Sequence, residues 1–484
     1  MIRLRRLLDR ARSDEGGFTL VEVVVALVLF AVITVGAIGA VGTMTGMSAD
    51  NRNREVAANL AQQAVDSARV EAREDIMGMA AETTYPVVDG TTYTVRRSVN
   101  WLTTASIDSQ CSTTLASGTG ALLFRHINVA VTWPNMRTST APVRSDTVFS
   151  PSSKINDPTA GTILISVTSI TASGGVAGIT ATITPNTNVT PNTAEAISAA
   201  AQPALTNADG CTYATKVPPG VYTVTVSGPS GTTYRDTQQQ AVSTKTVVVK
   251  AGDSAGASFT YDPAGDIRPT YAANYSGGTT PALPTNLVTT FVSTLDPYST
   301  TSPASDVFLS PLPSGYQVYA GRYSADTTAS TSCRSVDPTQ WPTAADGRVG
   351  KAPAPAAPTP GGSAKADVAM GVVTVTVANA DTVIRAKTMT AANDDPGCAA
   401  GMDYTITRSA TGRTGTATMT LALPFGTWAI TSGTSTTSQA AVTYGTLVGT
   451  LLGAVVAVQP GSSGTSGNAS SPITGVTLDP RVAP

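Results

Sequence analysis

The sequence predicts an α+β protein in which a long N-terminal helix and a small antiparallel sheet precede two or three all-β sandwich modules. Three observations predict it. Residues 23–49 form an uncharged, apolar run near the N-terminus. Beyond residue 76 the apolar residues alternate with polar ones, which is the period of a strand. The chain has 484 residues, more than one domain of about 100–200 residues would use.

The composition supports β-structure and excludes several functions. Charged residues are only 13%, against about 25% in an ordinary globular protein. The net charge of −2 offers no basic surface, so we expect no nucleic-acid partner. A single histidine, His126, leaves no basis for a histidine-ligated metal, and we expect no metal and no cofactor.

The four cysteines lie far apart and form no CxxC pair, so neither a zinc site nor a thioredoxin-like motif is expected. Disulfides suit an exported protein. The sequence leaves the pairing open. The candidates for disulfides are Cys111, Cys211, Cys333 and Cys398.

The first 17 residues are polar and carry five arginines against three acidic residues. The uncharged run of residues 23–49 would be about 40 Å long as a helix, which is enough to cross a bilayer. Because basic residues stay on the cytoplasmic side, the arginines place the N-terminus in the cytoplasm.

Glu22 is the unusual residue of this segment, since it lies within the apolar stretch. A carboxylate at the bilayer centre costs about 2.5–3.5 kcal/mol. If the chain were cut after Gly17, Phe18 would carry a new α-amino group about 6 Å along the helix from Glu22. Pairing with the amine of a neighbouring copy would offset the cost of burying both charges, and it would align identical helices side by side.

Residues 17–22, Gly-Phe-Thr-Leu-Val-Glu, and the apolar run behind them resemble the class III signal of type IV prepilins and type II secretion pseudopilins. The resemblance implies that a prepilin peptidase cleaves after Gly17 and methylates Phe18. It also implies that Glu22 acts in filament assembly and that the chain has no catalytic residues. The implied partners are prepilin peptidase, other pilin subunits and the membrane. The implied location is a single-pass membrane protein first and a pilus at the cell surface after assembly.

Three other interpretations of the N-terminus remain open. A conventional signal peptide could end near residues 40–42, where small residues permit cleavage. The segment could instead be a plain single-pass anchor. Neither alternative explains Glu22, although Glu22 could simply be tolerated at the membrane edge by snorkelling.

The helix is expected to continue to residue 76, because residues 49–76 contain no Gly or Pro. Val56, Leu60, Ala64 and Ala68 recur on one face of it. Strands follow at residues 91–101 and 122–133, and the alternation in the second places His126 on the exposed face. The end of this region resembles the heads of PilV-type minor pilins.

The remaining residues predict a series of β-modules. An Asp209-Gly210 turn, then Pro219-Gly220 and Tyr222 before alternating valines, resemble a carboxypeptidase-regulatory-like sandwich, which is a structural or binding module. This motif, a turn followed by an aromatic residue, recurs at Tyr316 and Trp428. We therefore divide the chain into a leader (1–17), a helix (18–76, with 18–49 in the membrane or filament core), a β head (77–150), a sandwich (162–262), a β module (266–350), a Pro/Ala linker (351–366) and a repeated sandwich (367–484).

Together these features predict a structural minor pilin whose β-modules are displayed at the surface, where they could bind a surface ligand for adhesion. The alternatives are a type II secretion pseudopilin and a membrane-anchored surface adhesin. No phosphate-binding loop, dinucleotide-binding motif or nucleophile motif follows a strand, so we expect no enzymatic activity.

Overall fold

The computed structural model describes residues 19–103, 108–109, 122–134, 136, 141–150, 157–172, 174–327, 330–410, 414–444, 455–460 and 473–482. The chain divides into two compact units. The first comprises Met1–Asp108 and Leu123–Lys154, and the second Ser109–Leu122 and Ile155–Pro484. The predicted N-terminal helix and β-rich remainder are both confirmed.

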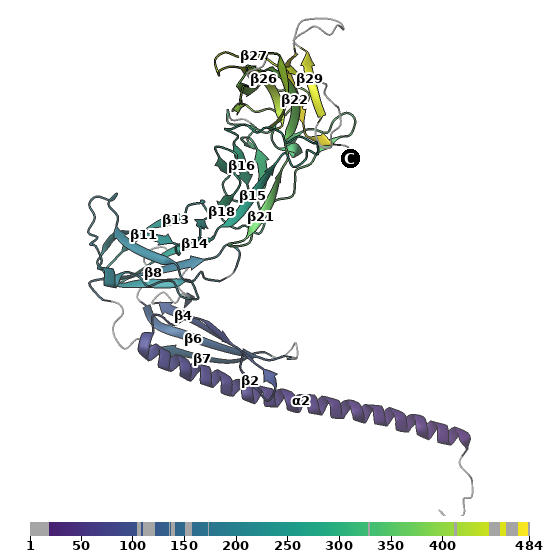
Figure 1. Ribbon diagram of the computed structural model, residues 1–484. Coiled ribbons are helices and arrows are strands. Elements are labelled where there is room, and N and C mark those ends of the chain that lie inside the picture. The colour runs from purple at the N-terminus through teal and green to yellow at the C-terminus, as the bar shows by residue number, and fades with distance from the viewer. Residues whose placement is uncertain are drawn as a thin grey trace, which may run out of the picture. The chain divides into compact units, whose positions relative to one another are not determined.

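The first unit consists of helix α2, Leu20–Asp75, and a small antiparallel sheet (Figure 1). The strand order is β1-β4-β6-β7, with β5 beside β4, and a separate hairpin pairs β2 with β3. The strand bounds are β1 Glu82–Thr84, β2 Val87–Val88, β3 Thr91–Thr92, β4 Thr94–Thr103, β5 Asp108–Ser109, β6 Leu122–Thr132 and β7 Val143–Phe149.

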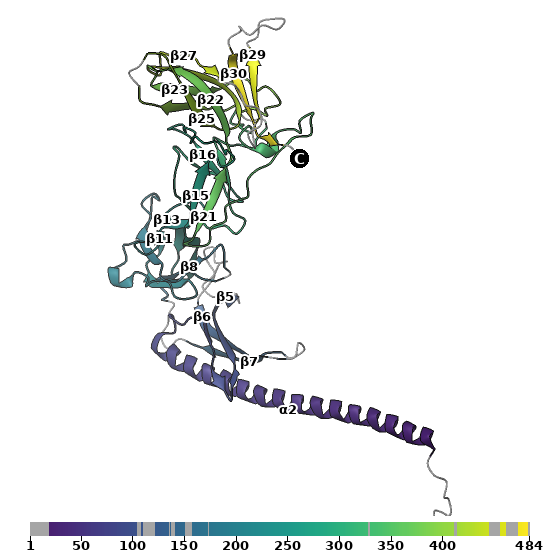
Figure 2. The same cartoon turned by 45° about the vertical axis from the view of Figure 1, so that its right-hand side comes forward.

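The C-terminal half of α2 packs on this sheet, while its N-terminal half extends clear of it in both views (Figures 1 and 2). The residues buried against the sheet are Ala57, Ala61, Val65 and Ala68, each at most 3% exposed. The predicted stripe is therefore shifted by one position over most of its length, and Val56, Leu60 and Ala64 lie at its edge, partly buried. Alanines occupy the centre because small side chains let a helix approach a sheet closely.

The second unit begins with a sandwich of two sheets and a shared core. One sheet has the order β10-β8-β14-β12 and the other β13-β11-β9. Its elements are β8 Gly161–Thr168, β9 Thr180–Pro185, η1 Ala199–Ala201, β10 Cys211–Val217, β11 Gly220–Ser227, β12 Tyr234–Asp236, β13 Val242–Val249 and β14 Ser254–Pro263. β8 pairs in parallel with β14, and the other pairs are antiparallel.

Two three-stranded sheets follow, with the orders β18-β15-β21 and β17-β16-β19. The elements are β15 Gly265–Tyr271, β16 Thr289–Val292, β17 Tyr298–Thr300, β18 Val307–Leu309, β19 Gln317–Ala320, η2 Pro338–Gln340, β20 Val349–Gly350 and β21 Ser363–Val368.

The last part contains the sheets β25-β22-β28 and β24-β23-β26-β30-β29, with β27 beside β26 and β31 paired to β20. The strands are β22 Gly371–Ala378, β23 Val383–Thr388, β24 Asp403–Thr407, β25 Thr416–Leu423, β26 Gly426–Gly433, β27 Ala440–Ala441, β28 Thr443–Tyr444, β29 Val455–Pro460, β30 Ile473–Asp479 and β31 Arg481–Val482.

The structure differs from the sequence-based division at residues 351–366. Residues from Ile267 to Leu478 contribute to one continuous hydrophobic cluster, so the two stretches on either side share a core. Part of the segment expected to be a linker packs into it: Ala356 is 4% exposed and exchanges backbone hydrogen bonds with Tyr316, and Pro358 and Ala366 are also buried. From Ser363 the chain forms β21, which pairs with β15. Burying an apolar Pro or Ala side chain is favourable, so individual residues of this segment can pack on the core while the others stay exposed.

The repeated motif of a turn and an aromatic residue forms equivalent structures at two of its three positions. The Tyr222 hydroxyl donates to the carbonyl of Pro218 at 3.0 Å, and the indole N–H of Trp428 donates to that of Pro424 at 2.9 Å. Each contact spans four residues, and each aromatic anchors a strand that begins at glycine, β11 or β26. The middle copy differs, because the Tyr316 hydroxyl donates six residues back, to Ser310, at 2.6 Å.

Candidate functional site

The candidate site is the N-terminal end of α2. Thr19 is the N-cap, with an extended backbone (φ −68°, ψ 145°), and its hydroxyl oxygen accepts from the Glu22 amide at 3.3 Å. In return, the Glu22 carboxylate accepts from the Thr19 amide at 3.4 Å. This reciprocal pair is a capping box, which satisfies two backbone donors that the first turn of a helix leaves without partners.

The helix behind this cap is suited to a membrane. Leu20–Ile38 has a mean hydropathy of 2.8 and is long and apolar enough to cross a bilayer. Its side chains are exposed, among them Leu20 at 82% and Ile38 at 67%. Glu22 is the only charged residue between these two positions. A large apolar surface of this kind marks an interaction with lipid or with other apolar helices.

Of the three N-terminal residues predicted from the sequence, Glu22 is described and lies at the start of the helix. Gly17 and Phe18 lie outside the described residues. The sequence reasoning sought a partner for Glu22 in a neighbouring molecule and missed its local partner, Thr19. The Thr-x-x-Glu spacing ahead of an apolar run was the available signal.

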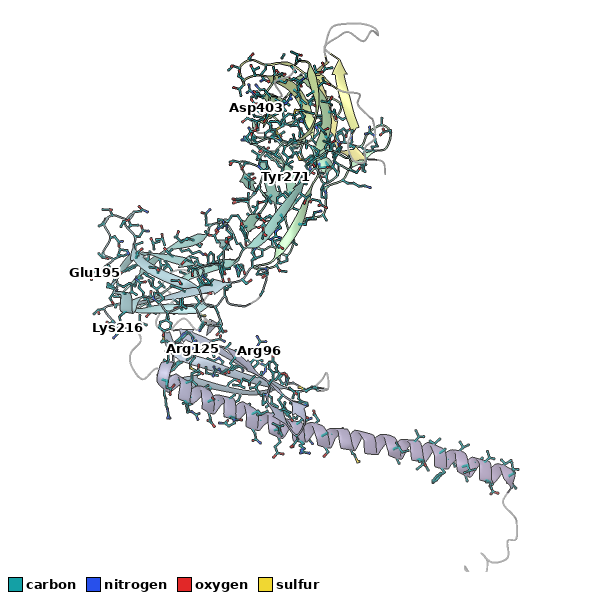
Figure 3. The ribbon with its side chains drawn as sticks, in the orientation of Figure 1. Arg96, Arg125, Glu195, Lys216, Tyr271 and Asp403 are labelled. Atoms are coloured by element: carbon teal, nitrogen blue, oxygen red, sulfur yellow. A yellow bond between two sulfur atoms is a disulfide. The ribbon has the colours of Figure 1, made fainter. Side chains whose placement is uncertain are left out.

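Two buried arginines fix the sheet to the end of α2. Arg97, on β4, contacts Glu71 of the helix at 2.6 Å and donates to the carbonyl of Ala80 at 3.0 Å. Arg125, labelled in Figure 3, lies on β6. It donates to the carbonyl of Met79 at 2.6 Å and lies 4.8 Å from the centroid of the Trp101 ring. These contacts order the chain where it leaves the helix, and so join the membrane segment to a folded head.

His126 alternates with buried neighbours on β6, as its expected place on the outer face of the sheet requires. Its imidazole lies 3.4 Å from the Asp146 carboxylate and is partly covered. In the described part of the chain, no group of three or more His, Cys, Asp or Glu side chains could hold a metal ion.

The structure assigns one pairing among the cysteines, a bond between Cys333 and Cys398, which are 65 residues apart. Cys211 is also disulfide-bonded. Cys111 lies outside the described residues. The sequence alone left this pairing open.

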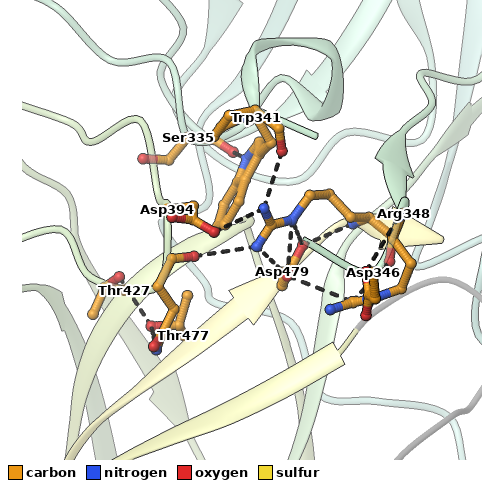
Figure 4. A network of polar contacts seen from close by, with 11 residues as sticks. Ser335, Trp341, Asp346, Arg348, Asp394, Thr427, Thr477 and Asp479 are labelled. Atoms are coloured by element: carbon orange, nitrogen blue, oxygen red, sulfur yellow. Dashed lines mark hydrogen bonds and ion pairs between the residues drawn. The ribbon is translucent and has the colours of Figure 1, made fainter. Parts of the chain in front are cut away.

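A dense polar network lies near the C-terminus (Figure 4). Arg481 is 4% exposed, pairs with Asp479 at 2.8 Å and Asp394 at 3.1 Å, and stacks over the Trp341 ring at 5.6 Å. Its guanidinium also donates to the carbonyls of Pro342 and Asn393. These acidic neighbours raise the pKa of Arg481, Asp479 foremost. The guanidinium nitrogens of Arg481 all have partners within the described chain, so the network fastens the C-terminal strands.

Comparison with known proteins identifies the N-terminal segment. Residues 12–38 match the prokaryotic N-terminal methylation motif, a signal of type IV pilin-like proteins. The matched range contains Gly17, Phe18 and Glu22. No curated protein matches the chain at a significant level.

Two solved structures are similar to part of the chain. The Bacillus anthracis TIE protein is 12% identical with a TM-score of 0.18, over 76% of this chain and 72% of that one. A streptococcal ancillary pilin is 12% identical with a TM-score of 0.18, over 42% of this chain and 67% of that one. TM-scores this low establish no common fold, and nothing functional is drawn from either likeness.

Proposed function

We propose that this chain is a minor subunit of a type IV pilus-like filament, cleaved between Gly17 and Phe18 by a prepilin peptidase and methylated at Phe18. The methylation motif at residues 12–38, which includes the exposed apolar helix segment Leu20–Ile38, carries the proposal. Within the filament, the apolar half of α2 packs beside the helices of other pilin subunits. The Glu22 carboxylate pairs with the free amine of a neighbouring Phe18, which offsets the burial of both charges.

The β-modules are the part that such a filament would display. Residues 161–482 build sandwiches and small sheets, a class of domain that commonly serves surface binding. So large a head would crowd a filament made of this subunit alone, which favours an occasional or terminal position. The role we propose for these modules is adhesion to a surface ligand, in a structural and binding protein without enzymatic activity.

Two other functions use the same N-terminus. A type II secretion pseudopilin would be processed in the same way and would assemble into a periplasmic filament. A membrane-anchored surface adhesin would retain the helix in the bilayer. The resemblance of the β-modules to carboxypeptidase-regulatory-like sandwiches favours binding but does not select among these systems.

The N-terminus of the exported protein tests the processing. Mass spectrometry is expected to find a chain that begins with methylated Phe18. A chain that begins near residue 42 would instead indicate a conventional signal peptide, and one that retains its leader would indicate a plain anchor.

Deleting residues 160–484 separates assembly from adhesion. The first unit has its own core around α2 and the sheet, so we expect it to fold and to enter filaments without the second unit. The truncated chain should carry Cys111→Ser, which removes its last cysteine. Normal filaments with lost attachment support the adhesive role, whereas lost filaments would place the β-modules in assembly.

A further inference from the structure

The Glu22 carboxylate lies at the start of an apolar helix, where its oxygens need hydrogen-bond partners. The structure shows the partners of one of the two oxygens. One carboxylate oxygen, Oε2, accepts from both the amide and the hydroxyl of Thr19, at 3.4 and 3.3 Å. The other oxygen, Oε1, makes no hydrogen bond to any described residue. Oε2 is therefore engaged by the chain's own Thr19, whereas Oε1 can accept a hydrogen bond from another molecule.

The hydroxyl of Thr19 is central to this arrangement, because it donates to Oε2 and also accepts from the Glu22 amide at 3.3 Å. These two contacts restrain the Glu22 side chain at both its backbone and its carboxylate. The N-terminus of the helix also carries a partial positive charge that favours a carboxylate there. A long, flexible side chain thereby loses most of its rotamer freedom before any partner arrives.

We infer that Thr19 is a positioning residue for subunit joining. It holds Oε2 of Glu22 against the start of the chain's own helix and leaves Oε1 to accept the ammonium group of a neighbouring subunit. Because the carboxylate is already oriented, less conformational entropy is lost when the amine binds. This inference rests on the proposed function, since it assumes that processing liberates an amine at Phe18.

The experiment compares Thr19→Val, which keeps the shape of the side chain but removes the hydroxyl, with Thr19→Ser, which keeps the hydroxyl. Each full-length variant is expressed with the other pilins, and two quantities are measured: processed subunit in the membrane and subunit in sheared filaments. We expect Thr19→Val to lower the filament-to-membrane ratio about five-fold, the factor that corresponds to ordering one flexible side chain on binding instead of beforehand. Thr19→Ser should restore the ratio.

Each outcome has a distinct meaning. If Thr19→Val assembles normally while Glu22→Gln does not, the positioning role is wrong and the proposed function stands. If Glu22→Gln assembles normally, the proposed role of Glu22 fails as well. If Thr19→Val lowers the membrane and filament amounts together, Thr19 only stabilises the helix, and the inference is overturned. A loss confined to the filament fraction, restored by serine, supports it.

Discussion

At the scale of single residues, Arg481 and Asp479 form a buried ion pair. Both are nearly inaccessible, and each is bonded to the other and to further groups. The pair Arg385–Asp403 has the same chemistry at the surface, with side chains 38% and 39% exposed. The two pairs allow a direct comparison of buried and exposed ion pairing in one protein.

Replacing Arg481 with methionine should destabilise the C-terminal part by about 3–5 kcal/mol, because the buried Asp479 charge then keeps only Arg348, 3.7 Å away, as a cationic partner. Arg385→Met is the matched control and should cost less than about 1 kcal/mol, since water replaces the lost partner. Urea unfolding followed by tryptophan fluorescence measures both, because Trp341 and Trp428 lie in this part of the chain. If the two variants have similar urea midpoints of unfolding, Arg481 does not fasten the C-terminal strands.

Asp262 should make the first sandwich dependent on pH. It is 1% exposed, and burial raises its pKa despite a 2.8 Å hydrogen bond from the Ile170 amide. A raised folded pKa means that the fold favours the protonated acid. Stability is therefore greatest below the ordinary pKa of about 3.9 and falls as the pH rises through that value to the folded pKa.

Asp262→Asn should remove this pH dependence and leave stability at neutral pH unchanged or higher, because the amide oxygen can still accept from Ile170. Native-state hydrogen exchange at β8 and β14, measured between pH 3 and 7, reports the opening free energy directly. Exposed Glu195 provides a control position, at which Glu195→Gln should leave the profile unaltered. A lasting pH dependence in Asp262→Asn would assign the effect to another group.

At the scale of elements, sequence periodicity was enough to predict α2 but not its orientation. The absence of Gly and Pro from residues 49–76 predicted a helix to residue 76, and α2 ends at Asp75. The predicted stripe ran through Val56, Leu60, Ala64 and Ala68. The sheet instead buries the neighbouring positions 57, 61 and 65 together with Ala68, and three of these four residues are alanines, whose small side chains let the helix approach the sheet closely.

The alanine stripe predicts a strict size limit at the helix–sheet contact. Ala61→Leu should cost about 1–3 kcal/mol, because Ala61 is 1% exposed and the added atoms have no space. Ala58→Leu, on the exposed face of the same helix, should change stability little. Thermal unfolding followed by near-ultraviolet circular dichroism of Trp101 and Trp133 measures both variants. Equal melting temperatures would show that the interface is loosely packed.

At the scale of the whole molecule, local patterns predicted the long helix and several of the strands, but they did not predict long-range contacts. The Thr-x-x-Glu cap and the motif ending in Trp428 are complete within six residues, so the sequence contains all that defines them. The hydrogen bond from Arg481 to the carbonyl of Pro342 joins positions 139 residues apart, and no local sequence pattern predicts it. The shared core across residues 351–366 was missed for the same reason, since composition alone cannot distinguish a Pro/Ala segment that is anchored to a core from a free spacer.

The disulfide allows a test of how the second unit is divided. The unit has two separate hydrophobic cores, and Cys333 belongs to the one that runs from Ile267 to Leu478. Replacing Cys333 and Cys398 together by serine releases a constraint across 65 residues and should cost about 2–4 kcal/mol. If the cores unfold independently, hydrogen exchange should accelerate at β26 and stay unchanged at β11. Mutation is preferable to a reducing agent, because reduction would also open the disulfide of Cys211. Equal acceleration at both strands would mean that the two cores unfold as a single cooperative unit. A force applied to the last module would then be transmitted directly to the first sandwich.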